Sequence, residues 1–224
     1  MTPKSRKRKE HKYSFTEKID YSKTGEKSIW GSGDKETLEI LHNLEVKGKW
    51  LNLAAGDGRY NQNLLKKADC VLASDIDEDA LQKLQRTASE NYKHKLDVKA
   101  FDITKTFPLD DNSFDGVFCT GILHLFPKDV LKKIALEIDR VLRPNGKIVI
   151  DFVADGERKR LNGKIIKSRG RPTYTLIEAK KMLEDIFKTY RIKMYVSELV
   201  DDLQKTDPPY TLNCKFIILV ADKI

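Results

Sequence analysis

Cysteine and long apolar runs are scarce in this sequence of 224 residues. The three cysteines form no Cys-x-x-Cys pair and no Cys/His spacing suited to zinc, so we expect free thiols and no metal site. The longest apolar run, Phe216 to Ala221, is too short to cross a bilayer, and the charged N-terminus lacks the apolar stretch of a signal peptide. These features predict a cytoplasmic protein that does not associate with membranes.

Positive charge is concentrated in two segments of the chain. The net charge is +8, to which residues 1–12 contribute +5 and residues 156–171 contribute +6, so that the remainder carries −3. An arm and a loop of one sign are typical of proteins that contact RNA or another anionic partner, although a lysine-rich surface without a partner has the same composition. We expect residues 1–33 to form a basic, partly disordered arm and residues 34–224 to form one domain.

Helix-period and strand-like segments alternate from residue 34 onward. A first helix is predicted between an N-cap at Asp34 and Gly48. Further helices are predicted at residues 59–68, 78–92, 128–142 and 176–187, and strands at 50–54, 70–74, 97–101, 114–120, 147–153, 190–198 and 213–221. This alternation indicates a doubly wound α/β fold with a mostly parallel, seven-stranded sheet and helices on both faces. Because no helix separates the last two strands, the final strand is expected to be antiparallel.

The turn after the first strand predicts a ligand site. Residues 54–58 read Ala-Ala-Gly-Asp-Gly and lie where ligands bind in open α/β sheets, and Gly56 and Gly58 permit close approach of the backbone. Asp75 closes the second strand, at the spacing from which a carboxylate can bind both ribose hydroxyls of an adenosine. Alone, this pattern also fits a glycine turn followed by a helix-capping aspartate.

Three later segments strengthen the prediction: residues 100–103 (Ala-Phe-Asp-Ile), residues 114–118 (Phe-Asp-Gly-Val-Phe) and residues 141–147 (Val-Leu-Arg-Pro-Asn-Gly-Lys). Together with the first turn and Asp75, they resemble the class I S-adenosylmethionine-dependent methyltransferase family, over about residues 34–221. The resemblance implies a Rossmann-like fold with a reversed last strand, S-adenosylmethionine as cofactor, and S-adenosylhomocysteine as its product.

The resemblance also implies a set of cofactor-binding residues. In that family the loop after the first strand lies against the methionine part of the cofactor, and its positions here are Ala54, Gly56 and Gly58. Asp75 matches the ribose carboxylate, and Ile76 would pack on the adenine ring. The other matched positions, at the adenine and in the donor pocket, are Asp102, Ile103, Thr120 and Gly121.

Two departures from the family pattern keep other functions open. Ala54 replaces the usual first glycine, and Asn52 replaces an acidic residue of the first strand, so a non-catalytic S-adenosylmethionine-binding module or partner subunit is the alternative. A nicotinamide oxidoreductase is disfavoured because it needs glycine or alanine at Asn61. Aminopropyl transfer is disfavoured because a polyamine acceptor requires acidic walls, whereas this edge is basic.

The acceptor side is less defined, and methyl transfer does not require a catalytic triad. His124 follows the fourth strand, where it either accepts a proton near neutral pH or packs among apolar neighbours. Tyr21 and Trp30 precede the domain, where the resemblance implies a lid over the cofactor, although solvated aromatics or a small satellite cluster would fit the sequence equally well. Residues 207–210 (Asp-Pro-Pro-Tyr) read as a stiff turn whose tyrosine could line an acceptor channel. The substrate-side candidates are therefore Tyr21, Arg158, Arg160, Arg169, Arg171 and Tyr210, and the acceptor is RNA, a nucleic-acid-associated protein or a small molecule.

Overall fold

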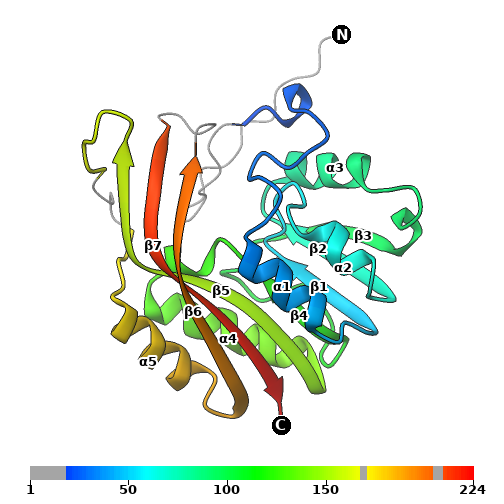
Figure 1. Cartoon of the computed structure of the whole chain (residues 1–224). Helices are drawn as coiled ribbons and strands as arrows, with labels where there is room; N and C mark the ends of the chain where they lie inside the picture. The colour runs from blue at the N-terminus through cyan, green and yellow to red at the C-terminus, as the bar shows by residue number, and fades with distance from the viewer. Residues whose placement is uncertain (1–18, 167–170, 204–208) are drawn as a thin grey trace.

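The apolar runs of the sequence form the strands of one sheet (Figure 1). The computed structural model describes residues 19–166, 171–203 and 209–224, with residues 201–203 described by their backbone. The strands are β1 (Lys49–Leu53), β2 (Cys70–Asp75), β3 (Leu96–Ala100), β4 (Phe114–Cys119), β5 (Leu142–Arg160), β6 (Tyr190–Leu203) and β7 (Tyr210–Lys223). Their order is β3-β2-β1-β4-β5-β7-β6. Strands β1 to β5 pair in parallel, and β7 is antiparallel to both of its neighbours. This confirms the predicted fold class.

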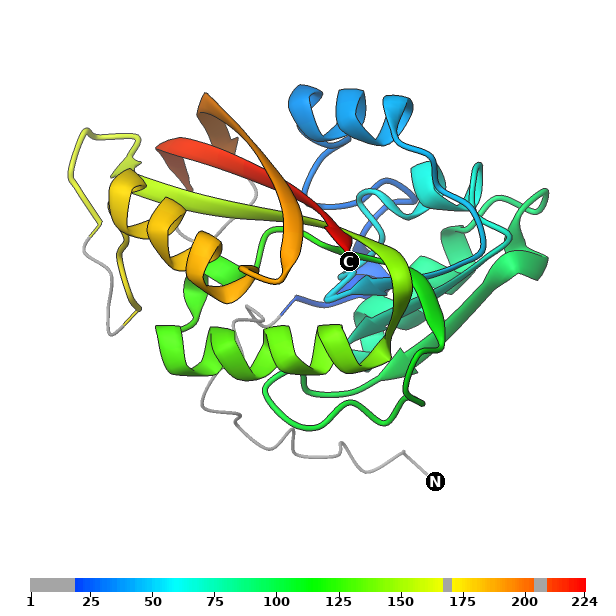
Figure 2. The ribbon, with the colours of Figure 1, turned by 90° about the horizontal axis from the view of Figure 1, so that it is seen from below.

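Helices cover both faces of the sheet (Figure 2). The helices are α1 (Lys35–Asn43), α2 (Asn61–Leu65), α3 (Glu78–Thr87), α4 (Lys128–Val141) and α5 (Leu176–Ile186). Leu41, Leu65 and Leu81 of α1, α2 and α3 share one buried cluster with Trp50. The helices α4 and α5 pack against the opposite face in a second cluster. Side chains alternate along each strand, so the central strands supply both clusters and are apolar throughout. No helix in the described part of the chain is long and apolar enough to cross a membrane.

Three predicted helices are shorter in the structure. Helix α1 ends at Asn43, well before Gly48, because Leu44 adopts an extended backbone. The first turn occupies residues 56–60, where the Asn61 amide donates to the Gly58 carbonyl, so α2 begins only at Asn61 and not at residue 59. Lys66 caps the end of α2, and the prediction that it extends to residue 68 was wrong. The α3 helix ends at Thr87, because Ala88 adopts an extended backbone, and residues 93–95 form a separate 3-10 turn.

The last three strands are longer than predicted. Strand β5 starts at Leu142, which pairs with Phe114 of β4, and not at residue 147 as predicted. It continues into the predicted basic loop as far as Arg160, because β7 pairs with it on both sides of a bulge between Ala154 and Glu157. We call residues 157–160, 200–203 and 210–213 the wing: a three-stranded antiparallel extension of β5, β6 and β7 (Figure 1).

Residues 19–34 cross the sheet at the carboxyl ends of the parallel strands, and we call them the lid. The lid is held by Asp57, a fully buried residue of the turn after β1, whose carboxylate accepts from the Ile29 amide at 2.8 Å and from the Ser28 hydroxyl at 2.5 Å. Lys83 of α3, which is equally buried, donates to the same carboxylate at 2.8 Å and to the Lys27 carbonyl at 2.9 Å. One ion pair therefore joins the lid, the turn and α3.

Replacing Lys83 with methionine should destabilise the protein strongly, because it leaves the Asp57 carboxylate buried without its cation. We expect the free energy of unfolding to fall by about 3–5 kcal/mol, as measured by urea denaturation. Lys93→Met is the matched control, since Lys93 pairs with Glu90 on the exposed surface, and it should cost about 1 kcal/mol or less. Equal losses in the two variants would contradict this role of the buried pair.

Candidate active site

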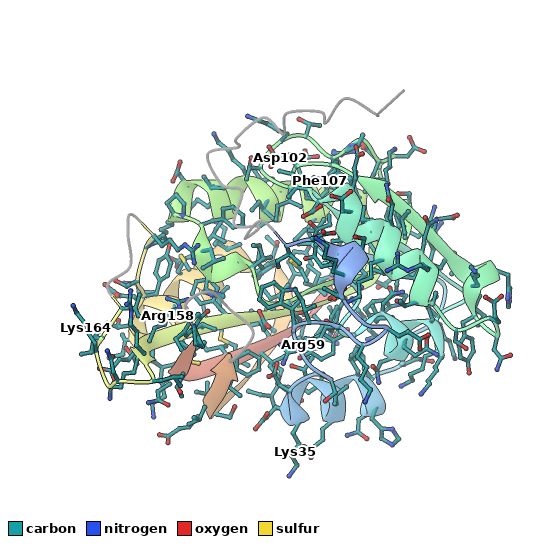
Figure 3. All side chains as sticks on the ribbon, turned by 90° about the horizontal axis from the view of Figure 1, so that it is seen from above. Lys35, Arg59, Asp102, Phe107, Arg158 and Lys164 are labelled. Carbon is teal, nitrogen blue, oxygen red and sulfur yellow. The ribbon has the colours of Figure 1, made fainter. Side chains whose placement is uncertain are left out.

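A cavity of about 300 Å³ opens at the carboxyl edge of the sheet, between the lid, the loops after the parallel strands and the wing. Figure 3 looks onto this edge and shows that Arg59, Asp102 and Arg158 come from three different parts of the chain. Ligands bind at this edge in open α/β sheets, because all the parallel strands end there. The cavity has two regions, which we call the donor half and the acceptor half.

The donor half is organised by Asp75, at the end of β2. One of its carboxylate oxygens accepts from the Gly56 amide at 2.8 Å, and the other accepts from the Asp77 amide at 2.9 Å. Burial raises the pKa of Asp75, while these backbone hydrogen bonds favour the ionised carboxylate. Asp75 is thereby fixed against the turn after β1, and Ile76, 37% exposed, lines the cavity beside it.

The other predicted positions of the donor half follow β3 and β4. Asp102 accepts from the amide and the hydroxyl of Thr104, at 2.9 and 2.8 Å. Ile103 is buried and lines the cavity, as do Thr120 and Gly121 at the end of β4. Gly58 does not line the cavity: its α-carbon faces Leu84 and Asn61, so its role is helix packing.

One wall of the acceptor half is formed by Asp34, Arg59 and Tyr60. The Asp34 carboxylate accepts from the Tyr60 hydroxyl at 2.6 Å and from the Arg59 guanidinium at 3.1 Å. Helix α1 does begin after Asp34, as predicted, but this side chain makes no capping hydrogen bond. Its carboxylate instead fixes the position of Arg59 at the cavity.

Asp151, on β5, lines the same half and is buried. One of its carboxylate oxygens accepts from the Gly121 amide at 2.7 Å, which places it next to the donor half. Burial raises the pKa of Asp151 to about 7, and the negative charge of Asp34 contributes to the increase. This carboxylate can therefore exchange a proton near neutral pH.

His124 also lines the acceptor half, but its chemistry differs from the prediction. Burial and the positive charges of Arg158 and Arg171 lower the pKa of its imidazole to about 3. The ring is therefore neutral near pH 7 and is a weak base, so the predicted role as proton acceptor near neutral pH is not supported. The ring packs edge-on against Phe152, with 6.3 Å between the ring centroids, which agrees with the packing alternative.

The substrate-side candidates separate into three groups. Tyr21, Arg158, Arg171 and Tyr210 line the cavity. Arg160 is exposed at the end of β5 and does not line it. Arg169 and residues 1–12 lie outside the described residues.

Comparisons with known proteins agree with this geometry. A family model described as a methyltransferase domain matches residues 51–150. An uncharacterized protein of Haemophilus influenzae is 31% identical over 129 residues, which are 56% of this chain and 51% of that protein. Phosphoethanolamine N-methyltransferase 1 of Triticum aestivum is 30% identical over 128 residues, which are 56% of this chain and 26% of that protein. The chain thus spans about half or less of the length of these relatives.

A solved S-adenosylmethionine-dependent methyltransferase from Mesorhizobium loti has the same fold, with a TM-score of 0.60, 16% identity, and coverage of 88% of this chain and 100% of that one. Residues 51–150 thus match a methyltransferase domain, and the chain has the fold of solved S-adenosylmethionine-dependent methyltransferases. The two departures of this chain from the family pattern can now be placed in the structure. Ala54 keeps a left-handed backbone, with φ of +55°, and such a conformation costs a non-glycine residue about 1–2 kcal/mol. Asn52 is buried and donates to Asn61 at 3.2 Å, so it braces the turn after β1.

The sequence pattern did not indicate Asp151 as a candidate site residue. Its signal was a single carboxylate within the apolar run 148–153, Ile-Val-Ile-Asp-Phe-Val. Such a residue is too costly to bury unless it has a partner or a function. Nor did the sequence indicate Arg59 as a cavity residue, because its position predicts only the start of a helix.

The raised pKa of Asp151 predicts a specific dependence of stability on pH. The folded protein holds this proton up to about pH 7, whereas the unfolded chain releases it near pH 4, so ionising Asp151 opposes folding as the pH rises between these values. Asp151→Asn should therefore gain stability relative to the wild type between pH 4 and pH 7, with no further gain above pH 7. Urea denaturation at pH 4.5, 6 and 8 measures this difference, and a difference independent of pH would contradict the raised pKa.

Proposed function

We propose that this protein binds S-adenosylmethionine in the donor half of the cavity and transfers its methyl group to a small acceptor in the acceptor half. The observation that carries the proposal is the continuity of the cavity. One cavity extends from the carboxylate of Asp75, which we assign to the ribose, to the acceptor half, which is lined by Asp151 and several arginines. Binding of both reactants in one space is what a direct displacement requires.

The residues of the donor half fit the cofactor. The two carboxylate oxygens of Asp75 accept from the Gly56 and Asp77 amides, and a carboxylate has about four acceptor sites, so it keeps capacity for hydrogen bonds from a ribose. Ile76 offers an apolar surface for the adenine face, and Asp102 lies near it in the same cavity. The Gly56 φ of +54° keeps the turn after β1 tight, with space for a ligand against the backbone.

Bound there, S-adenosylmethionine supplies an electrophilic methyl group, and S-adenosylhomocysteine is the product. The chain itself orients the acceptor, excludes water and takes up a proton. The side chains of Tyr21 and Trp30 hydrogen bond to each other and line the cavity from the lid, so they close it on the solvent side. Asp151, held by the Gly121 amide, would accept the proton that an amine or hydroxyl acceptor loses.

The shape of the acceptor half favours a small molecule over RNA. The lid and the wing both contribute side chains to the cavity, so an acceptor must fit between them. The wheat relative is named for a small phosphorylated amine, which supports the same class of acceptor. Recruitment of an anionic partner such as RNA through residues 1–12 and 156–171 is a separate prediction. Transfer of a labelled methyl group into a cell extract distinguishes an RNA acceptor from a small-molecule acceptor.

Binding of the cofactor should depend on Asp75. In Asp75→Asn, one acceptor oxygen becomes a donor amide, and the charge that strengthens hydrogen bonds from the ribose is lost. We expect the affinity for S-adenosylhomocysteine, measured by isothermal titration calorimetry, to fall about 10- to 100-fold. Asp97→Asn, an exposed position on the neighbouring strand β3, is the control and should bind as the wild type does. Unchanged affinity in Asp75→Asn would refute the assignment of the donor half.

Transfer of a labelled methyl group from S-adenosylmethionine into a cell extract identifies the class of acceptor. We expect label in the small-molecule fraction, lost with Asp75→Asn and reduced about 10²- to 10⁴-fold with Asp151→Asn at unchanged cofactor affinity. Label released from a macromolecule by nuclease or protease would instead support an RNA or protein acceptor. Tight cofactor binding without any Asp75-dependent label would support the non-catalytic module.

A further inference from the structure

Several buried nitrogen atoms of the acceptor half have no hydrogen-bond partner among the described residues. They are Nε of Arg59, Nδ1 of His124 and Nε of Arg158. All three residues line the same cavity. Buried polar atoms are nearly always hydrogen-bonded in folded proteins, so unsatisfied atoms gathered in the walls of one cavity indicate a ligand that would satisfy them. Two of the three belong to guanidinium groups, which can only donate, and the missing ligand must therefore supply acceptor atoms.

Arg158 is the strongest indication of the charge of that ligand. It is half-buried on β5, and it forms no ion pair in the part of the chain that the structure describes. Its guanidinium lies 5.9 Å from the ring centroid of Tyr210, a contact that orients the group. An arginine does not lose its proton, and a desolvated charge without a counter-ion is costly, so an anion is expected here.

Arg171 adds a second positive charge to the same region. It precedes α5, lines the cavity, and acts together with Arg158 to lower the pKa of His124. The positive charges of Arg158 and Arg171 therefore both act on the imidazole of His124, in the acceptor half. Arg59 adds no net charge to this region, because Asp34 neutralises it.

The negative charge of the acceptor half lies elsewhere, next to the donor half. Asp151 is bound to the Gly121 amide at the end of β4, whereas Arg158 belongs to the wing. Both residues are on β5, on the two sides of its bulge. An acceptor with an anion at one end and an amine or hydroxyl at the other would match this separation of charge.

We propose that Arg158 and Arg171 form an oxyanion subsite that binds the phosphate, sulfonate or carboxylate of a small methyl acceptor. The acceptor's amine or hydroxyl then lies at Asp151, and this inference rests on the proposed function. In the transfer, the lone pair of the acceptor nitrogen or oxygen forms a bond to the methyl carbon. The carbon–sulfur bond breaks with its electron pair remaining on sulfur, and the acceptor's proton passes to the Asp151 carboxylate.

The inference is tested by binding, with S-adenosylhomocysteine saturating the donor half. Isothermal titration calorimetry would compare inorganic phosphate, phosphoethanolamine and ethanolamine. We expect phosphoethanolamine to bind at least about 10-fold more tightly than ethanolamine, because charge-assisted hydrogen bonds from a guanidinium require the oxyanion. Arg158→Met should weaken phosphate and phosphoethanolamine by about 10-fold or more and leave ethanolamine and S-adenosylhomocysteine unchanged.

Lys159→Met is the matched control, since Lys159 neighbours Arg158 on β5, pairs with Glu157 and does not line the cavity. It should bind all four ligands as the wild type does. Equal binding of phosphoethanolamine and ethanolamine, or equal losses in the two variants, would overturn the oxyanion subsite. The oxyanion subsite for a small acceptor would also be overturned if a short RNA oligonucleotide bound in a manner that depends on Arg158 while phosphoethanolamine did not bind. Failure of the wild type to bind S-adenosylhomocysteine would instead overturn the proposed function itself.

Discussion

The buried ion pair between Asp57 and Lys83 is the interaction on which the site depends. Desolvating two charges is unfavourable unless further hydrogen bonds compensate, and here the pair also binds the Ile29 amide, the Ser28 hydroxyl and the Lys27 carbonyl. Those partners all belong to the lid. The turn after β1 and the lid are therefore held by the same carboxylate, and neither can shift without disturbing this buried ion pair.

The sheet extends this organisation to the rest of the cavity. Because the parallel strands end at one edge, Asp75, Gly121 and Asp151 meet there, although they are far apart in the sequence. Strand β5 then continues past that edge into the wing and carries Arg158 with it. A single strand thus supplies both the carboxylate beside the donor half and a cation of the acceptor half, and its bulge sets how these side chains are aimed.

The sequence predicted the features that depend on local patterns. Apolar runs defined the seven strands, and the spacing from Gly56 to Asp75 placed these two residues together, as the hydrogen bond between them shows. The sequence did not predict the length of β5, because its extension beyond residue 153 depends on pairing with β7, and such pairing is non-local. Nor did it predict the environment of His124 or the role of Asp151, since their pKa values depend on burial and on charges brought from other elements.

The insertion of β7 between β5 and β6 combines local and distant pairing at one side of the sheet. Within the described sheet, β6 pairs with β7 alone, and the two strands are neighbours in the chain. Residues of β6, including cavity-lining Leu199, therefore join the sheet only through β7, whose own pairing with β5 joins segments far apart in the sequence, from Arg160 with Tyr210 to Lys147 with Asp222. The wing is complete only when β6 and β7 have docked on β5, so the contact between Arg158 and Tyr210 depends on the least local pairing in this part of the sheet.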